Sequence, residues 1–158
     1  GPAVWRDTAC LARCMQVYTT GITTSKPNKG LEGVAFDAVR SVAYVLVEKG
    51  PRRVLELNLT AAGGAPVVTD LFDAEAVLGS QATDLAGVAF LPAPLQQLVI
   101  LSQESRSLIR LSLEGEVLEP PFTVGGTQPE GVAFTPDLAT FFIVSEPNEL
   151  LRYDYVPA

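Results

Sequence analysis

Acidic side chains recur at matching places in three repeated stretches of this sequence of 158 residues. The first place directly precedes a Gly-Val-Ala-Phe segment, and it is occupied by Glu32, Ala86 and Glu130 in the three stretches. The second place follows an apolar segment, and it is occupied by Glu48, Glu104 and Glu146. Asp84 stands two residues before Ala86 and is the candidate replacement for the lost acid. Carboxylates held together repel one another, and a bound cation relieves that repulsion. Calcium takes about six to eight oxygen ligands in flexible geometry and therefore suits such a group.

A structural explanation of the same acids stays open. A Glu-Gly pair before a strand can cap exposed backbone amides, and the acids of the second place can form ordinary ion pairs between neighbouring units. The candidate partners for those pairs are Arg53, Arg106, Arg110 and Arg152. A calcium titration followed by thermal unfolding separates the two interpretations, because only a metal site gains stability from the ion.

The acids are positioned by three copies of one strand-rich unit, at residues 31–59, 85–113 and 128–155. Each copy has a Gly-Val-Ala-Phe segment, an apolar segment and an alternating segment, and alternation places one side of a strand in a core. Units of this kind at roughly 45–55 residues are typical of propeller blades. We predict an all-β fold, a β-propeller with three blades of the four-stranded type at about 30–72, 84–124 and 128–158. Residues 1–29 precede them as an N-terminal segment with one strand at 14–20.

The outer strands differ between the three blades. We expect a fourth strand at 66–71 in the first blade and at 116–124 in the second, where Pro120 and Pro121 restrict it to a sheet edge. The third blade ends without one. Residues 72–83 form an insertion with an acid near its start and Gly79 at its end, which predicts one short helical turn.

Three blades cannot close a ring, because propellers need about four to eight. Either the chain is the C-terminal part of a longer polypeptide, or two copies assemble into a six-bladed ring. In the second case the strand at 14–20 would supply the missing outer strand of a partner's last blade. The expected partner is therefore another chain, or a second copy, that completes the propeller. Gly1 and Pro2 look like the remnant of a cleaved tag, so the native N-terminus and any signal peptide are not visible.

Composition excludes several classes of protein. A net charge of −7 argues against a nucleic-acid binder, and no apolar run approaches the roughly 20 residues of a membrane helix. The sequence has no histidine, which removes Ser-His-Asp and Cys-His pairs and the usual zinc and iron ligand sets. Cys10 and Cys14 are not a zinc motif without further ligands, and their redox state stays open.

The repeats also resemble a known family. Its closing blade is similar to EGVAF followed by VSEPNELLRYDY, and its middle blade to NKGLEGVAFDAVRSVAYVLVEKGPRRVLELNL. The blade between them is similar to LAGVAF followed by LVILSQESRSLIRLSLEGEVLE. This is the SdiA-regulated domain family, and the resemblance runs from about residue 28 to residue 155. It implies a phytase-like, six-bladed propeller, considerably longer full-length members and calcium near the channel mouth. Ala86 and the insertion at 72–83 depart from the family pattern.

We therefore expect a non-catalytic propeller module that binds a partner. We expect it to bind calcium as well, at one end of the central channel that the innermost strands of the blades would line. The metal ligands would be Glu32, Glu48, Asp84, Glu104, Glu130 and Glu146. We expect the module to be extracellular or on a cell surface. One alternative, from kinship alone, is a calcium-dependent phosphoesterase, against which stand the few lysines and the missing histidine. Another is a structural segment of a larger extracellular assembly.

Overall fold

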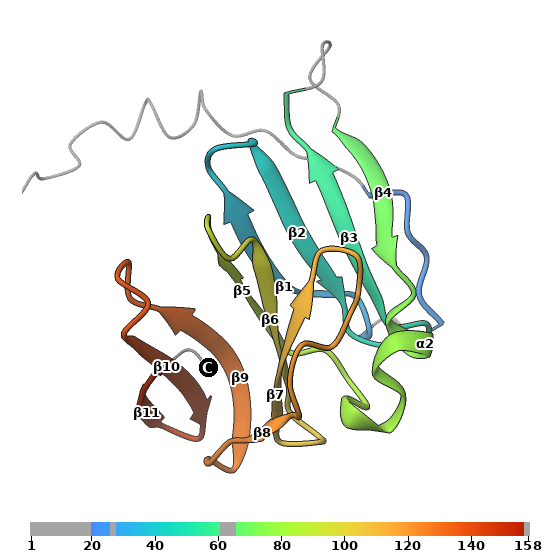
Figure 1. Cartoon of the computed structure of the whole chain (residues 1–158). Coiled ribbons are helices and arrows are strands. Elements are labelled where there is room, and N and C mark those ends of the chain that lie inside the picture. The colour runs from blue at the N-terminus through green and yellow to red at the C-terminus, as the bar shows by residue number, and fades with distance from the viewer. Residues whose placement is uncertain (1–19, 26–27, 61–65, 157–158) are drawn as a thin grey trace, which may run out of the picture.

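The computed structural model describes residues 20–25, 28–60 and 66–156. These residues form three antiparallel sheets that stand side by side (Figure 1). The first sheet contains β1 (Leu31–Asp37), β2 (Val42–Val47), β3 (Arg53–Asn58) and β4 (Val67–Phe72). The second contains β5 (Gly87–Leu91), β6 (Gln97–Ser102), β7 (Ser107–Ser112) and β8 (Phe122–Thr123). The third contains β9 (Gln128–Phe134), β10 (Thr140–Glu146) and β11 (Glu149–Asp154).

The first strands of the three sheets lie next to one another, β1 against β5 and β5 against β9. Each sheet runs outward from this inner strand in chain order, as the blades of a propeller do. The predicted all-β fold of propeller blades is thus confirmed. The strand predicted at 14–20, and the two cysteines, lie outside the described residues.

The glycine of the Gly-Val-Ala-Phe segment is needed where the inner strands meet. A Cβ atom added at Gly87 would lie 3.2 Å from the backbone oxygen of Glu130 and 3.2 Å from Cα of Gly131. Both atoms belong to the backbone of β9, so a larger residue on β5 would push the third sheet away from the second. This contact explains why a strand interior keeps a residue that is otherwise unfavourable there.

Two hydrophobic cores fill the junctions between the sheets. Alternation on β2 sends Tyr44 and Leu46 into the core that the first sheet shares with the second. The core between the second and third sheets includes Leu101, Phe141 and Ile143. A third cluster, which includes Ala43, Val45, Val47, Leu55 and Leu57, covers the opposite face of the first sheet and packs against Ile22.

Several apolar residues of the strands are exposed. Val34 is 67% exposed, Phe36 53% and Val144 50%. The register pairs Val34 with Val45 and Phe36 with Ala43, which places both on the face of the first sheet that points away from the second. Val144 alternates with the buried Ile143 and lies on the outward face of the third sheet. The three sheets form a row, and its two end faces are the outward faces of the first and third sheets. Both end faces therefore carry apolar side chains that are exposed to water.

The insertion forms the predicted helical turn, α2 (Ala74–Leu78), followed by the short 3-10 turn η1 (Gly79–Gln81). The Asp73 carboxylate accepts a hydrogen bond from the Ala76 amide at 3.2 Å, and Gly79 ends the helix with φ of +50°. The buried Arg52 guanidinium donates to Glu75 at 2.5 Å and to the Gly79 carbonyl at 2.9 Å. These contacts hold α2 against the first junction, where Ala74 and Leu78 are buried.

The outer strands are less regular than predicted. The second sheet has one isolated bridge between Leu111 and Val117, and β8 then covers only two residues. Pro120 and Pro121 interrupt this segment because proline has no amide to donate to a ladder. The third sheet has three strands among the described residues, so β11 is its outer edge.

Candidate cation site at the inner ends of the sheets

A pocket of about 200 Å³ opens where the three sheets meet. We call it the acidic pocket, and it is lined by Asn28, Lys29, Glu32, Glu48, Asp84, Ala86, Gln103 and Glu130. Glu32 lies on β1, Glu48 directly follows β2, Asp84 precedes β5 and Glu130 lies on β9. Four of the six predicted acids thus converge on one pocket, although they are up to about a hundred residues apart in the chain.

The backbone links that bring the acids together are visible in two places. The Leu85 amide donates to the Glu48 carbonyl at 3.3 Å and ties the start of the second sheet to the first. The Ala86 amide donates to the Leu101 carbonyl at 2.9 Å, which holds the segment before β5 against β6. Asp84 is therefore fixed between the first and second sheets.

Glu104 does not occupy the position that the sequence comparison gave it. The registers pair Gly33 with Leu46, Gly87 with Leu101 and Gly131 with Val144. Two residues beyond these partners lie Glu48, Gln103 and Glu146, so Gln103 is the true counterpart and Glu104 falls one residue later. Gln103, not Glu104, lines the acidic pocket.

Glu104 instead forms an ion pair with Lys49 outside the acidic pocket. Its carboxylate accepts a short hydrogen bond from the Lys49 ammonium and another from the Thr83 hydroxyl at 3.1 Å. The bond from Lys49 holds the pKa of Glu104 below its ordinary value. Glu48 and Glu104 do form ion pairs, but with Lys29 and Lys49. Three of the four candidate arginines pair elsewhere: Arg53 with Asp70 at 2.8 Å, Arg110 with Glu119 at 3.3 Å, and Arg152 with Asp154 at 3.0 Å.

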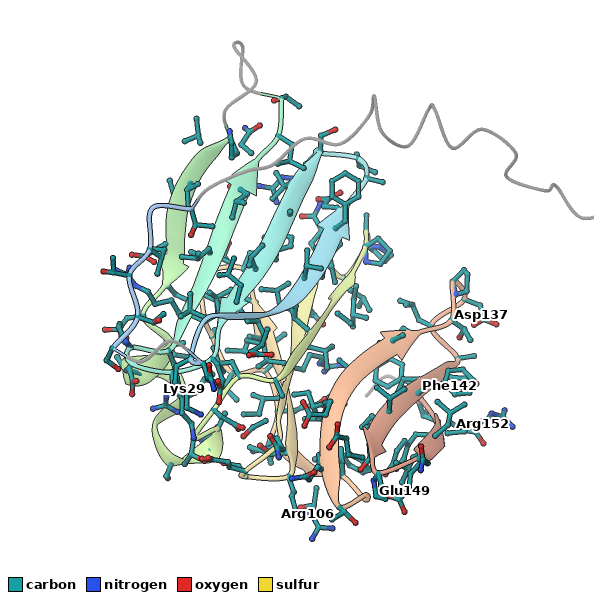
Figure 2. The ribbon with its side chains drawn as sticks, turned by 180° about the vertical axis from the view of Figure 1, so that it is seen from behind. Lys29, Arg106, Asp137, Phe142, Glu149 and Arg152 are labelled. Atoms are coloured by element: carbon teal, nitrogen blue, oxygen red, sulfur yellow. The ribbon has the colours of Figure 1, made fainter. Side chains whose placement is uncertain are left out.

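Lys29 is the cation of the acidic pocket. Its Nζ atom lies 2.7 Å from Oε1 of Glu48. The hydrogen bond to Glu48, with the nearby charges of Glu104 and Asp84, raises the pKa of Lys29. Figure 2 shows Lys29 beside the ends of the strands of the first sheet. Lys29 therefore neutralises Glu48 in the structure as it stands.

Within the part of the chain that the structure describes, Asp84 is held by hydrogen bonds and by no ion pair. It is 2% exposed, and its Oδ1 atom accepts from the Ser102 hydroxyl at 2.5 Å and from the Glu104 amide at 3.1 Å. Ser102 is itself fully buried and also accepts from the Ser105 amide at 3.1 Å. These neutral donors orient the Asp84 carboxylate.

Glu130 lies among the acids of the cluster, and its pKa is raised above the ordinary value. Glu130 is largely exposed, but partial desolvation of its carboxylate raises its pKa, and the charges of Glu146, Glu32, Asp84 and Glu48 raise it further, in that order. Glu146 is paired with Gln128 in the register of β9 and β10, which sets it beside Glu130, although it does not line the pocket. Five acids therefore act on one another at this place, and the sixth, Glu104, is compensated by Lys49.

The donors suit a hard cation in kind but are not assembled as a coordination shell. Carboxylate and amide oxygens are the ligands that calcium prefers. Among the described residues, however, no group of three or more acidic, histidine or cysteine side chains is placed to hold a metal ion. A cation would therefore have to draw the side chains of Glu32, Glu48 and Glu130 inward.

Among the residues that the structure describes, no helix is long and apolar enough to cross a membrane.

Sequence reasoning missed Asn28, Lys29 and Gln103 as members of the site. The signal for Gln103 was present, because Ser102 and Ser145 are equivalent and the next residues are Gln103 and Glu146. Lys29 lies in a loop before β1, outside the repeated pattern, and no sequence pattern indicates that it reaches Glu48.

Comparisons with known proteins agree with this architecture. A family model described as SdiA-regulated matches residues 6–154. A luciferin-regenerating enzyme superposes with a TM-score of 0.59 at 22% identity, over 73% of this chain and 37% of the other. Regucalcin of Agrobacterium tumefaciens, described as a calcium-binding protein, gives 0.58 at 17%, over 75% and 39%. A gluconolactonase of Xanthomonas campestris gives 0.57 at 15%, over 77% and 37%.

These solved structures are propellers, and at such identities they show the fold alone. The present chain spans well under half the length of each of them.

Proposed function

The chain belongs to the SdiA-regulated family, and from this premise we propose that it is a propeller module that works by binding. The acidic pocket takes calcium, and the exposed end faces of the row of sheets meet a partner. One observation carries the proposal: carboxylates from all three sheets converge on a pocket of about 200 Å³ that holds one lysine. Such an arrangement retains negative charge that a divalent cation would neutralise.

Calcium would be held by oxygen atoms of Glu32, Asp84 and Glu130, with Glu48 released from Lys29. The Gln103 and Asn28 side chains offer neutral oxygens at the same pocket. Because the shell has to be assembled, we expect weak binding, with a Kd of about 10⁻⁴ to 10⁻³ M, as in extracellular modules. Calcium reaches such concentrations outside cells, so we also propose an extracellular or cell-surface setting.

Binding, and not hydrolysis, is favoured by the roles of the serines near the pocket. Ser102 donates to Asp84, and Ser107 donates to the Gln81 carbonyl at 2.6 Å. Ser145 accepts from the Gln128 amide at 3.0 Å. Each hydroxyl is thus engaged in a hydrogen bond that supports the fold. The sequence has no histidine that could act as a base and activate a serine as a nucleophile.

The partner would cover the two end faces of the row. Leu31, Val34 and Phe36 are exposed on the first sheet, and Val144 and Leu150 on the third. Phe142 and Arg152 project from the same end of the third sheet (Figure 2). Faces of this kind are buried when blades stack, so we propose that further blades, from another chain or a second copy, pack on them.

Thermal unfolding in rising calcium tests the proposal. At a calcium concentration of ten times the Kd, a single site stabilises the folded state by about 1.4 kcal/mol. We expect this gain to be lost in Glu130→Gln and retained in Glu114→Gln, which changes an exposed acid outside the acidic pocket. An unchanged unfolding temperature at 10 mM calcium, or phosphoester hydrolysis that Glu130→Gln abolishes, would overturn it.

A further inference from the structure

We propose that Asn58 is an acceptor for an N-linked oligosaccharide when the chain is exported from the cell. The inference rests on the extracellular setting proposed above, but it concerns a different surface from the acidic pocket and does not depend on calcium. The sequence Asn58-Leu59-Thr60 is the motif that such a transfer requires: an asparagine, then any residue except proline, then a serine or threonine. In a secreted protein this motif marks a surface position that can carry a bulky, solubilising group.

The motif lies where β3 ends and a turn begins. Asn58 is the last residue of β3, and Leu59 and Thr60 follow in the turn. Asn58 and Thr60 are exposed, whereas Leu59 between them packs against the hydrophobic cluster on the outward face of the first sheet. The Leu59 amide also donates to the Ser41 carbonyl at 3.1 Å. The middle residue therefore anchors the motif, and the two outer side chains are open to solvent.

Hydrogen bonds within the motif fix the orientation of the Asn58 side-chain amide. Its Oδ1 atom accepts from the Thr60 backbone amide at 3.0 Å and from the Thr60 hydroxyl at 2.7 Å. Because a backbone amide can only donate, the Asn58 atom that faces it must be the oxygen. The Nδ2 atom lies on the other side of the side-chain amide, and none of the residues that the structure describes accepts a hydrogen bond from it. The nitrogen that would receive the sugar is therefore unengaged at the surface.

The other two asparagines of the chain provide a contrast. Asn28 and Asn148 are also exposed, but the residues two positions further on are Gly30 and Leu150, which have no hydroxyl group. Exposure is thus common to all three asparagines, and the required hydroxyl accompanies Asn58 alone. The inference accordingly predicts a single modified position.

Asn58 stands at the end of the first sheet that is remote from the acidic pocket. The register pairs Asn58 with Val42 at one end of β2, whereas Glu48 of the pocket directly follows the other end. Strand geometry separates these two ends by roughly 17 Å. On the other side of Asn58, its partner on β4 is Val67, which is 56% exposed. An oligosaccharide at Asn58 would therefore extend into solvent and leave the acidic pocket accessible.

The transfer needs a lipid-linked oligosaccharide diphosphate as the donor and an enzyme of the export pathway as the catalyst. A bond forms between Nδ2 of Asn58 and the first carbon of the sugar, and the bond from that carbon to the diphosphate oxygen breaks. The diphosphate leaves with the electron pair of the broken bond, and a base of the enzyme takes one proton from Nδ2. The chain supplies the acceptor nitrogen and the Thr60 hydroxyl of the motif.

Production of the full chain behind a cleavable secretion signal in cultured animal cells tests the inference. We expect a product that migrates more slowly in electrophoresis, and an amidase that removes N-linked oligosaccharides should restore the mobility and convert Asn58 to aspartate. Asn58→Gln and Thr60→Ala should each lose the oligosaccharide. Thr60→Ser, which keeps the hydroxyl, and Asn148→Gln, which changes an exposed asparagine outside the motif, should retain it.

The cell extract and the medium are both analysed, so protein that stays inside the cells is counted. An unaltered chain without the oligosaccharide, or an oligosaccharide that persists in Asn58→Gln, would overturn the inference. Calcium titration of the same purified chain reports separately on the proposed function. A modified chain that binds no calcium would contradict only that function, and an unmodified chain that binds calcium would contradict only the inference about Asn58.

Discussion

The Lys29 ammonium lies 2.7 Å from the Glu48 carboxylate, and this contact is the ion pair of the acidic pocket. Within the described part of the chain, no ion pair joins Glu32, Asp84 or Glu130 to a basic side chain. One lysine thus stands against four lining acids, and the balance of charge favours a cation.

Replacing Lys29 by methionine should tighten calcium binding by about threefold to tenfold. The substitution frees the Glu48 carboxylate and adds one negative charge to the pocket, and calcium affinity rises with ligand charge. Isothermal titration measures the effect. Arg152→Met serves as the control, since Arg152 lies on the exposed face of β11 and pairs with Asp154. An affinity that falls in Lys29→Met would mean that Lys29 builds the site and does not compete for it.

The stability of the protein should depend on pH through Glu130. Its pKa is raised in the folded state, so the folded chain binds this proton more tightly than the unfolded chain. The stabilising contribution is therefore present below the ordinary pKa of 4.5 and is lost as pH rises through the higher, folded value.

Glu130→Gln should consequently be more stable than the unaltered chain at pH 7, by less than about 1 kcal/mol because the group is exposed. The difference should vanish below pH 4. Urea unfolding at several pH values measures it in calcium-free buffer. A variant that is less stable at pH 7 would contradict the assignment of repulsion at Glu130.

Ser102→Ala should destabilise the fold by about 1–3 kcal/mol, because it removes a donor from the buried Asp84 carboxylate. Ser105→Ala in the same turn is the matched control, since Ser105 is more accessible and contacts Thr83. We expect the control to cost less than about 1 kcal/mol. Equal losses in the two variants, measured by chemical denaturation, would show that the Ser102 hydroxyl has no special task.

Gly87→Ala should destabilise the protein by about 1–3 kcal/mol, since the added methyl group meets the backbone of β9 at 3.2 Å. It should also weaken calcium binding, because the displaced backbone carries Glu130. Gly30→Ala is the control, as nothing lies within 4 Å of a Cβ atom there. Thermal unfolding and titration of both variants provide the comparison; a neutral Gly87→Ala would mean that the inner strands are not in close contact.

The sequence alone predicted the sheets well, because each strand is marked by an independent local pattern. The Gly-Val-Ala-Phe segments, the apolar second strands and the alternating third strands all appear at their expected places. The helical turn at the insertion was equally legible from Asp73 and Gly79. These features depend on backbone preference and alternation, which neighbouring residues determine.

The details of the site were less predictable because they depend on the registers of the strands. Glu104 matches Glu48 and Glu146 by residue type, but Glu48 and Glu146 are the first residues after Val47 and Ser145, whereas Glu104 is the second residue after Ser102. Gln103 is the first residue there and therefore occupies the place in the pocket. The pairing of Glu48 with Lys29 was hidden for another reason, since a loop lysine reaches its partner only through the tertiary fold.

The central claim is that the acidic pocket binds calcium, and isothermal titration of the full chain tests it most directly. We predict one calcium per chain with a Kd of about 10⁻⁴ to 10⁻³ M. Binding should be at least tenfold weaker in Glu130→Gln and unchanged in Glu114→Gln. The absence of binding heat at 10 mM calcium, or equal affinity in all three proteins, would contradict it.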